Sequence, residues 1–439
     1  MTTTAAQIDN VRAEEDTRFP VLSAKLPQLL YYAVIFSIPF FRFRQISGAA
    51  PFLKVDWLLV MALAAIVAPY LFIRKSVPRS FASNIWPWFA LFFIVNLSSS
   101  LLSPYPNAAF SGIVLLLIDF AFISINLLMV DRRGFRTIMP LVLAIAVTLN
   151  AVLACLGYFL NVAYFRAGGR GIGGTIGANN AAVMGIFVLP LIMHWIWNSR
   201  KTAVTNVAIV ALVINILGII STESRAGFLN MMLILALSLY TERHRFHPRF
   251  LGIVMAGAGI IVMVAILAVP EQYIARQSTI LEGTQADVST QRRAAYIDVG
   301  IRSFLHHPII GTGTQTFSQV WVNSQEALRF KREERGAHNT YIEVAVGSGL
   351  LGLAFFGMLL LQCLMNYTKA VHLYREADDA ENMSLAKAYR LSFVSVLIYF
   401  LFKSGLDHKM FLLAIPLSQT ALNLARQDTL QNGQERTTQ

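Results

Sequence analysis

The chain has 439 residues, of which 56% are hydrophobic and only 14% are charged. Soluble domains carry about 25% charged residues, so the composition excludes a purely soluble protein. The net charge of +12 lies in short basic clusters between apolar runs. Such clusters are typical of membrane topology signals, and they argue against a nucleic-acid partner.

Apolar runs of about 20 residues recur along the chain and predict an all-α integral membrane protein with about twelve transmembrane helices. In chain order, the expected spans are 22–42, 55–73, 84–102, 112–130, 137–160, 180–197, 203–221, 226–241, 250–269, 340–366, 391–404 and 410–425. We interpret residues 1–439 as a single polytopic membrane domain with polar tails at 1–21 and 426–439.

Lysine and arginine are concentrated in alternate loops, which predicts that both termini lie in the cytoplasm. The long polar segment 270–339 then lies outside, and it is too short for a domain with its own core. Within it, Gln291–Leu305 has the apolar spacing of an amphipathic helix that rests on the membrane or on the bundle, and His307-Pro308 ends this helix. Gly311-Thr312-Gly313 follows as a turn.

His338 lies where this polar segment runs into an apolar helix. Thr340 and Glu343 have the spacing of a capping box, so the helix is expected to start at Thr340, with its positive dipole end facing outward. An anion is favoured at such an end. Similar starts are expected at Asn179 or Asn180, at Ser224 and at Asp407. Taken alone, His338 fits a solvated or structural histidine as well as a catalytic one.

Several arginines in outside segments run against the topology signal. Arg225 lies in a very short turn, Arg292 and Arg293 open the amphipathic helix, and Arg170 lies in a glycine-rich loop. A guanidinium group suits two-point contacts with phosphate oxygens. The alternative for each arginine is snorkelling, or a salt bridge such as Arg225 with Glu223.

Other polar residues in apolar surroundings point to different chemistry. Asp119 lies deep in a predicted span and is the best argument for a transporter. His306 and His307 lack further ligands at metal-binding spacing, so we expect no metal site. Cys155 and Cys363 lie in apolar runs, where buried free thiols are expected and a structural disulfide is not.

Four motifs in this order resemble bacterial O-antigen ligases, within the superfamily of O-antigen ligases and polymerases. The motifs are the glycine-rich stretch Gly173–Asn180, the turn Ser224-Arg225-Ala226-Gly227, the stretch from Arg292 to Gly313, and Ala337-His338-Asn339-Thr340-Tyr341. The last three fall within about residues 215–365, and the first half of the chain matches mainly in its pattern of spans.

The resemblance implies a twelve-span, GT-C-like membrane glycosyltransferase in the bacterial inner membrane, with segment 270–339 in the periplasm. It implies transfer of a glycan from undecaprenyl pyrophosphate to a sugar of lipid A-core, with inversion and with no metal or cofactor. By matching position, Arg225 and one of Arg292 or Arg293 bind the pyrophosphate, and Arg170 is a looser match. His338 acts on the acceptor hydroxyl, as its general base or as its orienting group.

Three alternatives remain open at this point. An O-antigen polymerase and a protein O-oligosaccharyltransferase use the same lipid donor and differ only in the acceptor. A polysaccharide or lipid transporter belongs to another class, and it requires polar residues along the span interiors. Charge that gathers at the outside rim instead favours chemistry at the membrane surface.

Overall fold

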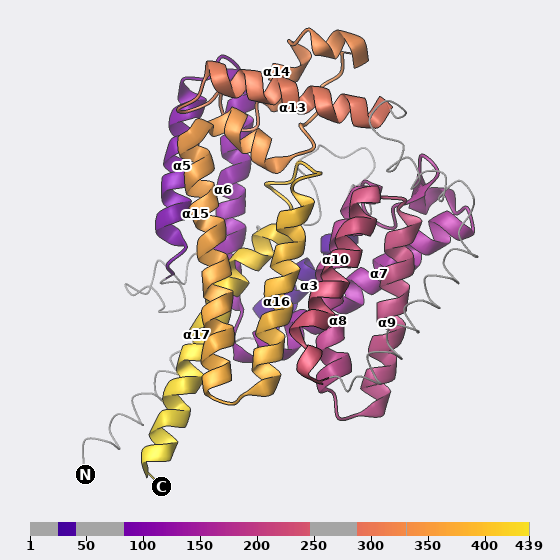
Figure 1. Cartoon of the computed structure of the whole chain (residues 1–439), viewed down its shortest axis with the longest axis vertical. Coiled ribbons are helices and arrows are strands. Elements are labelled where there is room, and N and C mark those ends of the chain that lie inside the picture. The colour runs from indigo at the N-terminus through magenta and orange to yellow at the C-terminus, as the bar shows by residue number, and fades with distance from the viewer. Residues whose placement is uncertain (1–24, 41–82, 246–287, 331, 439) are drawn as a thin grey trace.

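The computed structural model describes residues 25–40, 83–245, 288–330 and 332–438, and these are almost entirely helical (Figure 1). Two predicted spans, 55–73 and 250–269, and the tail 1–21 lie outside the described residues. The C-terminal segment from 426 continues a long helix that starts at Lys409.

The long helices follow the apolar runs closely. In chain order they are α3 (Lys25–Ser37), α5 (Trp86–Leu101), α6 (Pro106–Met129), α7 (Met139–Phe159), α8 (Ala178–Asn198), α9 (Thr202–Ser221), α10 (Arg225–Thr241), α13 (Val288–His306), α14 (Phe317–Val322), α15 (Thr340–Glu376), α16 (Ala380–Tyr399) and α17 (Lys409–Thr438). Short π and 3₁₀ turns cover Gly134–Ile138, Ala163–Phe165, Arg243–Arg245 and Glu326–Phe330. One hairpin is formed by β1 (Arg166–Ala167) and β2 (Arg170–Gly171).

Five helical segments among the described residues are long and apolar enough to cross a bilayer. They are Pro106–Met129, Gly134–Phe159, Ala178–Asn198, Thr202–Ser221 and Thr340–Glu376. The protein is therefore an all-α integral membrane protein, as the composition predicts. The full set of twelve spans stays a prediction.

Helix α8 is the central helix of one half of the bundle, and every residue from 181 to 194 is buried. Hydrophobic burial does not drive helices together in lipid, so close packing through small side chains matters more. A Cβ atom on Gly185 would lie 2.8 Å from the Ile219 side chain of α9. The Ser392 hydroxyl of α16 donates to the Phe187 carbonyl at 2.6 Å. Both contacts fix neighbouring helices against α8.

Helix α13 lies across one end of the bundle, transverse to α5, α6 and α15, while the C-terminus lies at the other end (Figure 1). It ends at His306, directly before His307-Pro308, as the sequence predicts. Tyr296 and Val299 pack into a small core with Phe317 and Trp321 of α14. The apolar stripe Ile297, Ile301 and Leu305 is instead exposed, by 42, 50 and 67%. The helix therefore turns its aromatic side to the bundle and its aliphatic side outward.

Helix α15 is interrupted at Gly349, whose φ of 64° and ψ of −161° are not helical. The turn Gly311-Thr312-Gly313 fills the interruption. Thr312 N–H donates to the Val346 carbonyl at 2.8 Å, and Gly313 N–H donates to the Gly347 carbonyl at 2.9 Å. A broken helix in a membrane protein is tolerated where other parts of the protein satisfy the freed backbone groups, and here the turn satisfies them.

We predict that Gly349→Ala destabilises the protein. The new Cβ atom would overlap the Ile309 carbonyl oxygen, and the positive φ disfavours any side chain. A cost of about 1–3 kcal/mol is typical of such backbone strain. The midpoint of thermal unfolding in detergent should fall clearly below that of the wild type.

Gly357→Ala is the matched control in the same helix, since nothing lies within 4 Å of its added Cβ atom. This variant should be as stable as the wild type or slightly more stable. Equal unfolding midpoints for both variants would contradict the requirement for glycine at position 349.

Candidate active site

The N-terminal ends of three helices converge at the end of the bundle that carries α13. The Ser224 hydroxyl, which caps α10, donates to the Asn179 side chain of α8 at 3.0 Å. The same hydroxyl lies 3.2 Å from the Tyr399 hydroxyl at the end of α16. Thr340 N–H at the start of α15 donates to the Phe400 carbonyl at 2.9 Å. Three positive helix ends therefore meet the negative, carbonyl end of α16, so the helix dipoles partly cancel there and do not by themselves make an anion site.

The predicted helix caps are correct in part. Ser224 caps α10 and accepts from Gly227 N–H. Helix α15 begins at Thr340 as predicted, but its cap is Asn339, which accepts from Ile342 N–H at 3.1 Å. The capping box of Thr340 with Glu343 was wrong, because Glu343 reaches the Ala337 N–H instead.

The two remaining cap predictions were wrong. Helix α8 begins at Ala178 after Gly177, so Asn179 and Asn180 are already helical and do not cap it. Helix α17 begins at Lys409, two residues after the predicted cap Asp407. Asn179 instead accepts from the Ser224 hydroxyl and so joins α8 to α10.

The backbone at His338 is fixed by hydrogen bonds to both sides. His338 N–H donates to the Ser404 hydroxyl at 2.9 Å, and that hydroxyl donates to the Glu343 carboxylate at 2.5 Å. Glu343 also accepts from Ala337 N–H at 2.9 Å. His338 itself has a φ of 52°, a left-handed conformation that is rare for a residue other than glycine. Such conformations persist where the surroundings over-determine them, as at functional sites.

The imidazole of His338 is half-buried among cations. Burial, and then the positive charge of Arg293, lowers the pKa of His338 to about 4. Lys403, Arg335 and Arg292 act in the same direction. The side chain is therefore neutral at physiological pH, and one ring nitrogen is able to accept a proton. The surplus of positive charge around it has the character of an anion site.

Several hydrogen-bond donors close to His338 are buried without a partner among the described residues. They are Arg292 Nε, Arg335 Nε, the Tyr296 hydroxyl and Trp321 Nε1. Burial raises the pKa of Tyr296, whereas the guanidinium groups of Arg335 and Arg292 lower it, so these three groups lie close together. The Tyr296 ring also lies 5.8 Å from the His338 ring. Buried donors without partners are costly, and an anionic ligand would satisfy them.

Arg170 and Arg225 belong to the neighbouring part of this site. Arg170 Nε donates to the Thr222 carbonyl at 2.7 Å, which ties the β1–β2 hairpin to the turn before α10. Arg225 is the first residue of α10 and directly follows the Ser224 cap. The charges of Arg170 and Arg293 both act on the Tyr399 hydroxyl. Tyr399 therefore links the two groups of arginines.

Sequence reasoning missed four residues of this site: Arg335, Lys403, Tyr296 and Tyr399. Arg335 is three residues from His338, and Lys403 lies near the end of the predicted span 391–404. Only the fold brings Tyr399 at the end of α16 against the start of α15, and Tyr296 of α13 beside His338, so the two tyrosines had no local signal. The hairpin at Arg170 did have a local sequence signal, since Gly168-Gly169 is a typical two-residue turn.

The other polar candidates lie away from this site. Asp119 accepts from Lys409 Nζ at 3.3 Å, so the buried acid belongs to an ion pair between α6 and α17. His306 and His307 are exposed. The described residues contain no group of three or more His, Cys, Asp or Glu side chains that could hold a metal ion. Cys155 and Cys363 are free.

The fold and the site together define an all-helical integral membrane protein with a cationic, histidine-containing site at one end of its helices. Residues 210–357, roughly a third of the chain, match the family described as O-antigen ligase. The match supports membership in the superfamily of O-antigen ligases and polymerases, whose members are glycosyltransferase-like enzymes. The matched segment includes Arg225, Arg292, Arg293 and His338, and it leaves out Arg170. No curated protein matches the chain.

The low pKa of His338 predicts a pH-dependent stability. Between pH about 6.5 and about 4 the unfolded chain binds a proton at this histidine and the folded protein does not. Protonation of His338 in the unfolded chain therefore lowers the free energy of unfolding as the pH falls through this range. The thermal unfolding midpoint of the wild type should fall more steeply from pH 7 to pH 5 than that of His338→Asn.

His306→Asn serves as the control, since His306 is exposed at the end of α13. This variant should keep the wild-type slope. An equal slope for the wild type and His338→Asn would show that His338 is not held neutral.

Proposed function

We propose that the protein is an O-antigen ligase, a glycosyltransferase that moves a glycan from undecaprenyl pyrophosphate to a sugar hydroxyl of lipid A-core. The observation that carries the proposal is a neutral, backbone-fixed His338 next to Arg293, Arg335 and Lys403. Transfer from a pyrophosphate donor needs a base beside a group of cations that can bind the pyrophosphate. The family match over residues 210–357 supports the same reaction class.

The site acts at the periplasmic side of the inner membrane, with both chain termini in the cytoplasm. Basic residues in alternate loops support this orientation. Nucleotide sugars are absent there, so the energy for transfer comes from the sugar–phosphate bond of the donor. The exposed aliphatic stripe of α13 is compatible with a position at the membrane surface.

In the proposed reaction one ring nitrogen of His338 takes the proton of the acceptor hydroxyl. The hydroxyl oxygen forms a bond to the anomeric carbon of the donor sugar from the face opposite the leaving group, so the configuration is inverted. The bond from that carbon to the phosphate oxygen breaks, and undecaprenyl pyrophosphate leaves with the electron pair. Arginines that bind the pyrophosphate stabilise the charge that grows on it.

Arg293 is the better candidate of the paired arginines for the phosphate contact. Its charge acts on both His338 and the Tyr399 hydroxyl, so it lies between the two arginine groups. Arg292 is directed toward Tyr296. Arg225 and Arg170 complete the proposed pyrophosphate site from the other side. A bound pyrophosphate would offset the cations around His338 and raise the pKa of its imidazole, which makes it a stronger base only after the donor has bound.

His338→Ala should abolish transfer of glycan to lipid A-core while the protein still folds and inserts. The loss of a general base typically lowers the rate by about 10²–10⁴-fold. Transfer is measured with purified protein, lipid-linked glycan and lipid A-core. His306→Ala is the control and should transfer at the wild-type rate. Wild-type transfer by His338→Ala would refute the catalytic role.

Arg225→Lys and Arg293→Lys should keep a positive charge and still lose about 10²–10³-fold in rate, since lysine cannot make the two-point contact. Arg302→Lys is the matched control, because Arg302 lies on α13 and pairs instead with Asp298 and Glu326. It should retain wild-type transfer. Full activity of both site variants would argue against bidentate phosphate binding.

An O-antigen polymerase or a protein O-oligosaccharyltransferase would use the same donor site. The lipopolysaccharide of a deletion strain separates them. Loss of all long glycan from lipid A-core, while lipid-linked polymer is still made, identifies a ligase. A single repeat unit left on the core identifies a polymerase. A transporter is less favoured, because its main support, Asp119, is paired with Lys409.

A further inference from the structure

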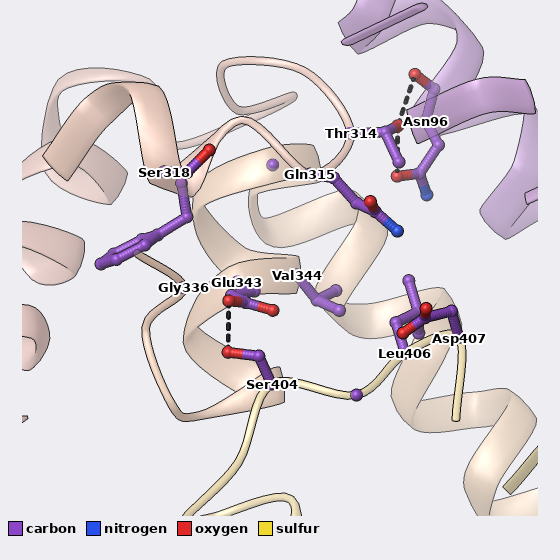
Figure 2. A pocket seen from close by; sticks show the side chains of 13 residues that line it. Asn96, Thr314, Gln315, Ser318, Gly336, Glu343, Val344, Ser404, Leu406 and Asp407 are labelled. Atoms are coloured by element: carbon purple, nitrogen blue, oxygen red, sulfur yellow. Dashed lines mark hydrogen bonds between the residues drawn. The ribbon is translucent and has the colours of Figure 1, made fainter. Parts of the chain in front are cut away.

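A cavity of about 240 Å³ lies behind the 336–338 backbone, next to the histidine site but separate from it (Figure 2). It opens between α5, the turn that leads to α14, the start of α15 and the loop before α17. Thirteen residues line it, and His338 and the arginines of the proposed pyrophosphate site are not among them. Ser404 and Glu343 form the wall between the two spaces, and both hold the backbone beside His338.

The polar groups of this cavity are oxygens and amides. Glu343 uses one carboxylate oxygen for Ser404 and Ala337, and Figure 2 shows the other directed away from Ser404 toward the cavity. Gln315 and Asp407 project toward the space between them from two different loops (Figure 2). These side chains offer both donors and acceptors to hydroxyl groups.

Among the described residues that line the cavity none is cationic, whereas Glu343 and Asp407 contribute two carboxyl groups. Lys403 lies outside the lining, and its charge acts on both carboxyl groups. Burial raises the pKa of Glu343 to about 7, so this carboxyl group is only partly charged at neutral pH. An anion is therefore less favoured here than at the site around His338, where several cations gather. Apolar atoms of Phe317, Val344 and Leu406 complete the wall. A pyranose ring combines hydroxyl groups at its edge with C–H groups on its faces, and this lining matches both.

We infer that the cavity is a binding site for one neutral sugar ring of the substrate. Pockets for drug-sized ligands begin at about 300 Å³, and this cavity is slightly smaller. Its volume therefore suits one sugar ring and not a glycan chain. The sugar bound here is a neighbour of the reacting sugar, since one layer of residues separates the cavity from His338. Binding of a neutral sugar stands on the cavity itself, whereas the place of this sugar in the substrate, and its origin from acceptor or donor, rest on the proposed function.

Direct binding tests the cavity without any transfer reaction. The probes are the methyl glycosides of glucose, galactose and N-acetylglucosamine, with methyl glucuronide as the anionic partner of methyl glucoside. Saturation-transfer difference NMR on the full-length protein in detergent should show binding of at least one neutral glycoside and a weaker signal for the glucuronide. Gln315→Ala and Asp407→Asn should each weaken the neutral signal by about three- to tenfold, as expected for the loss of one hydrogen bond.

Asn323→Ala is the control variant, because Asn323 is an exposed amide on the same segment and lies outside the cavity. It should bind the probes like the wild type. A neutral signal that survives unchanged in both cavity variants, no signal for any neutral probe, or equal signals for glucoside and glucuronide would overturn the inference.

Steady-state kinetics then identify the source of the sugar. If the cavity holds an acceptor sugar, Gln315→Ala raises the KM for lipid A-core by about three- to tenfold and leaves kcat and the donor KM near the wild-type values. If it holds a sugar of the donor glycan, the KM for the donor rises instead. Unchanged KM values for both substrates would overturn a role in transfer. If the wild type transfers no glycan at all, the proposed function fails, while the probe-binding result still decides whether the cavity binds sugar.

Discussion

The hydrogen bonds between the start of α15 and the loop after α16 are the contacts on which the site depends. Thr340 N–H binds the Phe400 carbonyl, and the Thr340 hydroxyl donates to the Lys403 carbonyl at 2.7 Å. His338 N–H binds Ser404 in the same region. These bonds bring a helix start against a helix end that lies about sixty residues further along the chain. They hold the imidazole in place before any substrate arrives, which is the preorganisation that catalysis requires.

Charge is separated around this contact. Arg292, Arg293 and Arg335 surround His338 on one side, whereas Glu343 and Asp407 line the cavity on the other. The charge of Lys403 acts on both groups. Ser404 stands between them and bonds to both sides. A ligand with a charged end and a neutral sugar end would find opposite environments a few residues apart. The proposed donor, a lipid-linked glycan, has two such ends.

Much of this arrangement could be predicted from the sequence, because apolar runs and charge clusters are local signals. The helices, the amphipathic α13 and its end before Pro308, and the Ser224 cap follow from such signals. Contacts that depend on distant segments could not be predicted. Asn339 caps α15 in place of Thr340, because Thr340 bonds to the segment after α16. Glu343 bonds to Ala337 and Ser404 instead of forming a capping box. The meeting of Tyr399 with both arginine groups likewise arises only from helix packing.

The interruption of α15 also affects how the protein responds to the thickness of the bilayer. The Val346 and Gly347 carbonyls before the break accept from the turn at 312–313, and Leu350 and Leu351 N–H after the break donate to the Pro308 and Ile309 carbonyls of the same segment. Bilayers differ in thickness, and a membrane helix answers a mismatch by tilting. Because the segment 308–313 is bonded to both sides of Gly349, we expect the break to keep its angle, so that the two parts of α15 tilt together with this segment. The reactive end would then keep its geometry in membranes of different lipid composition.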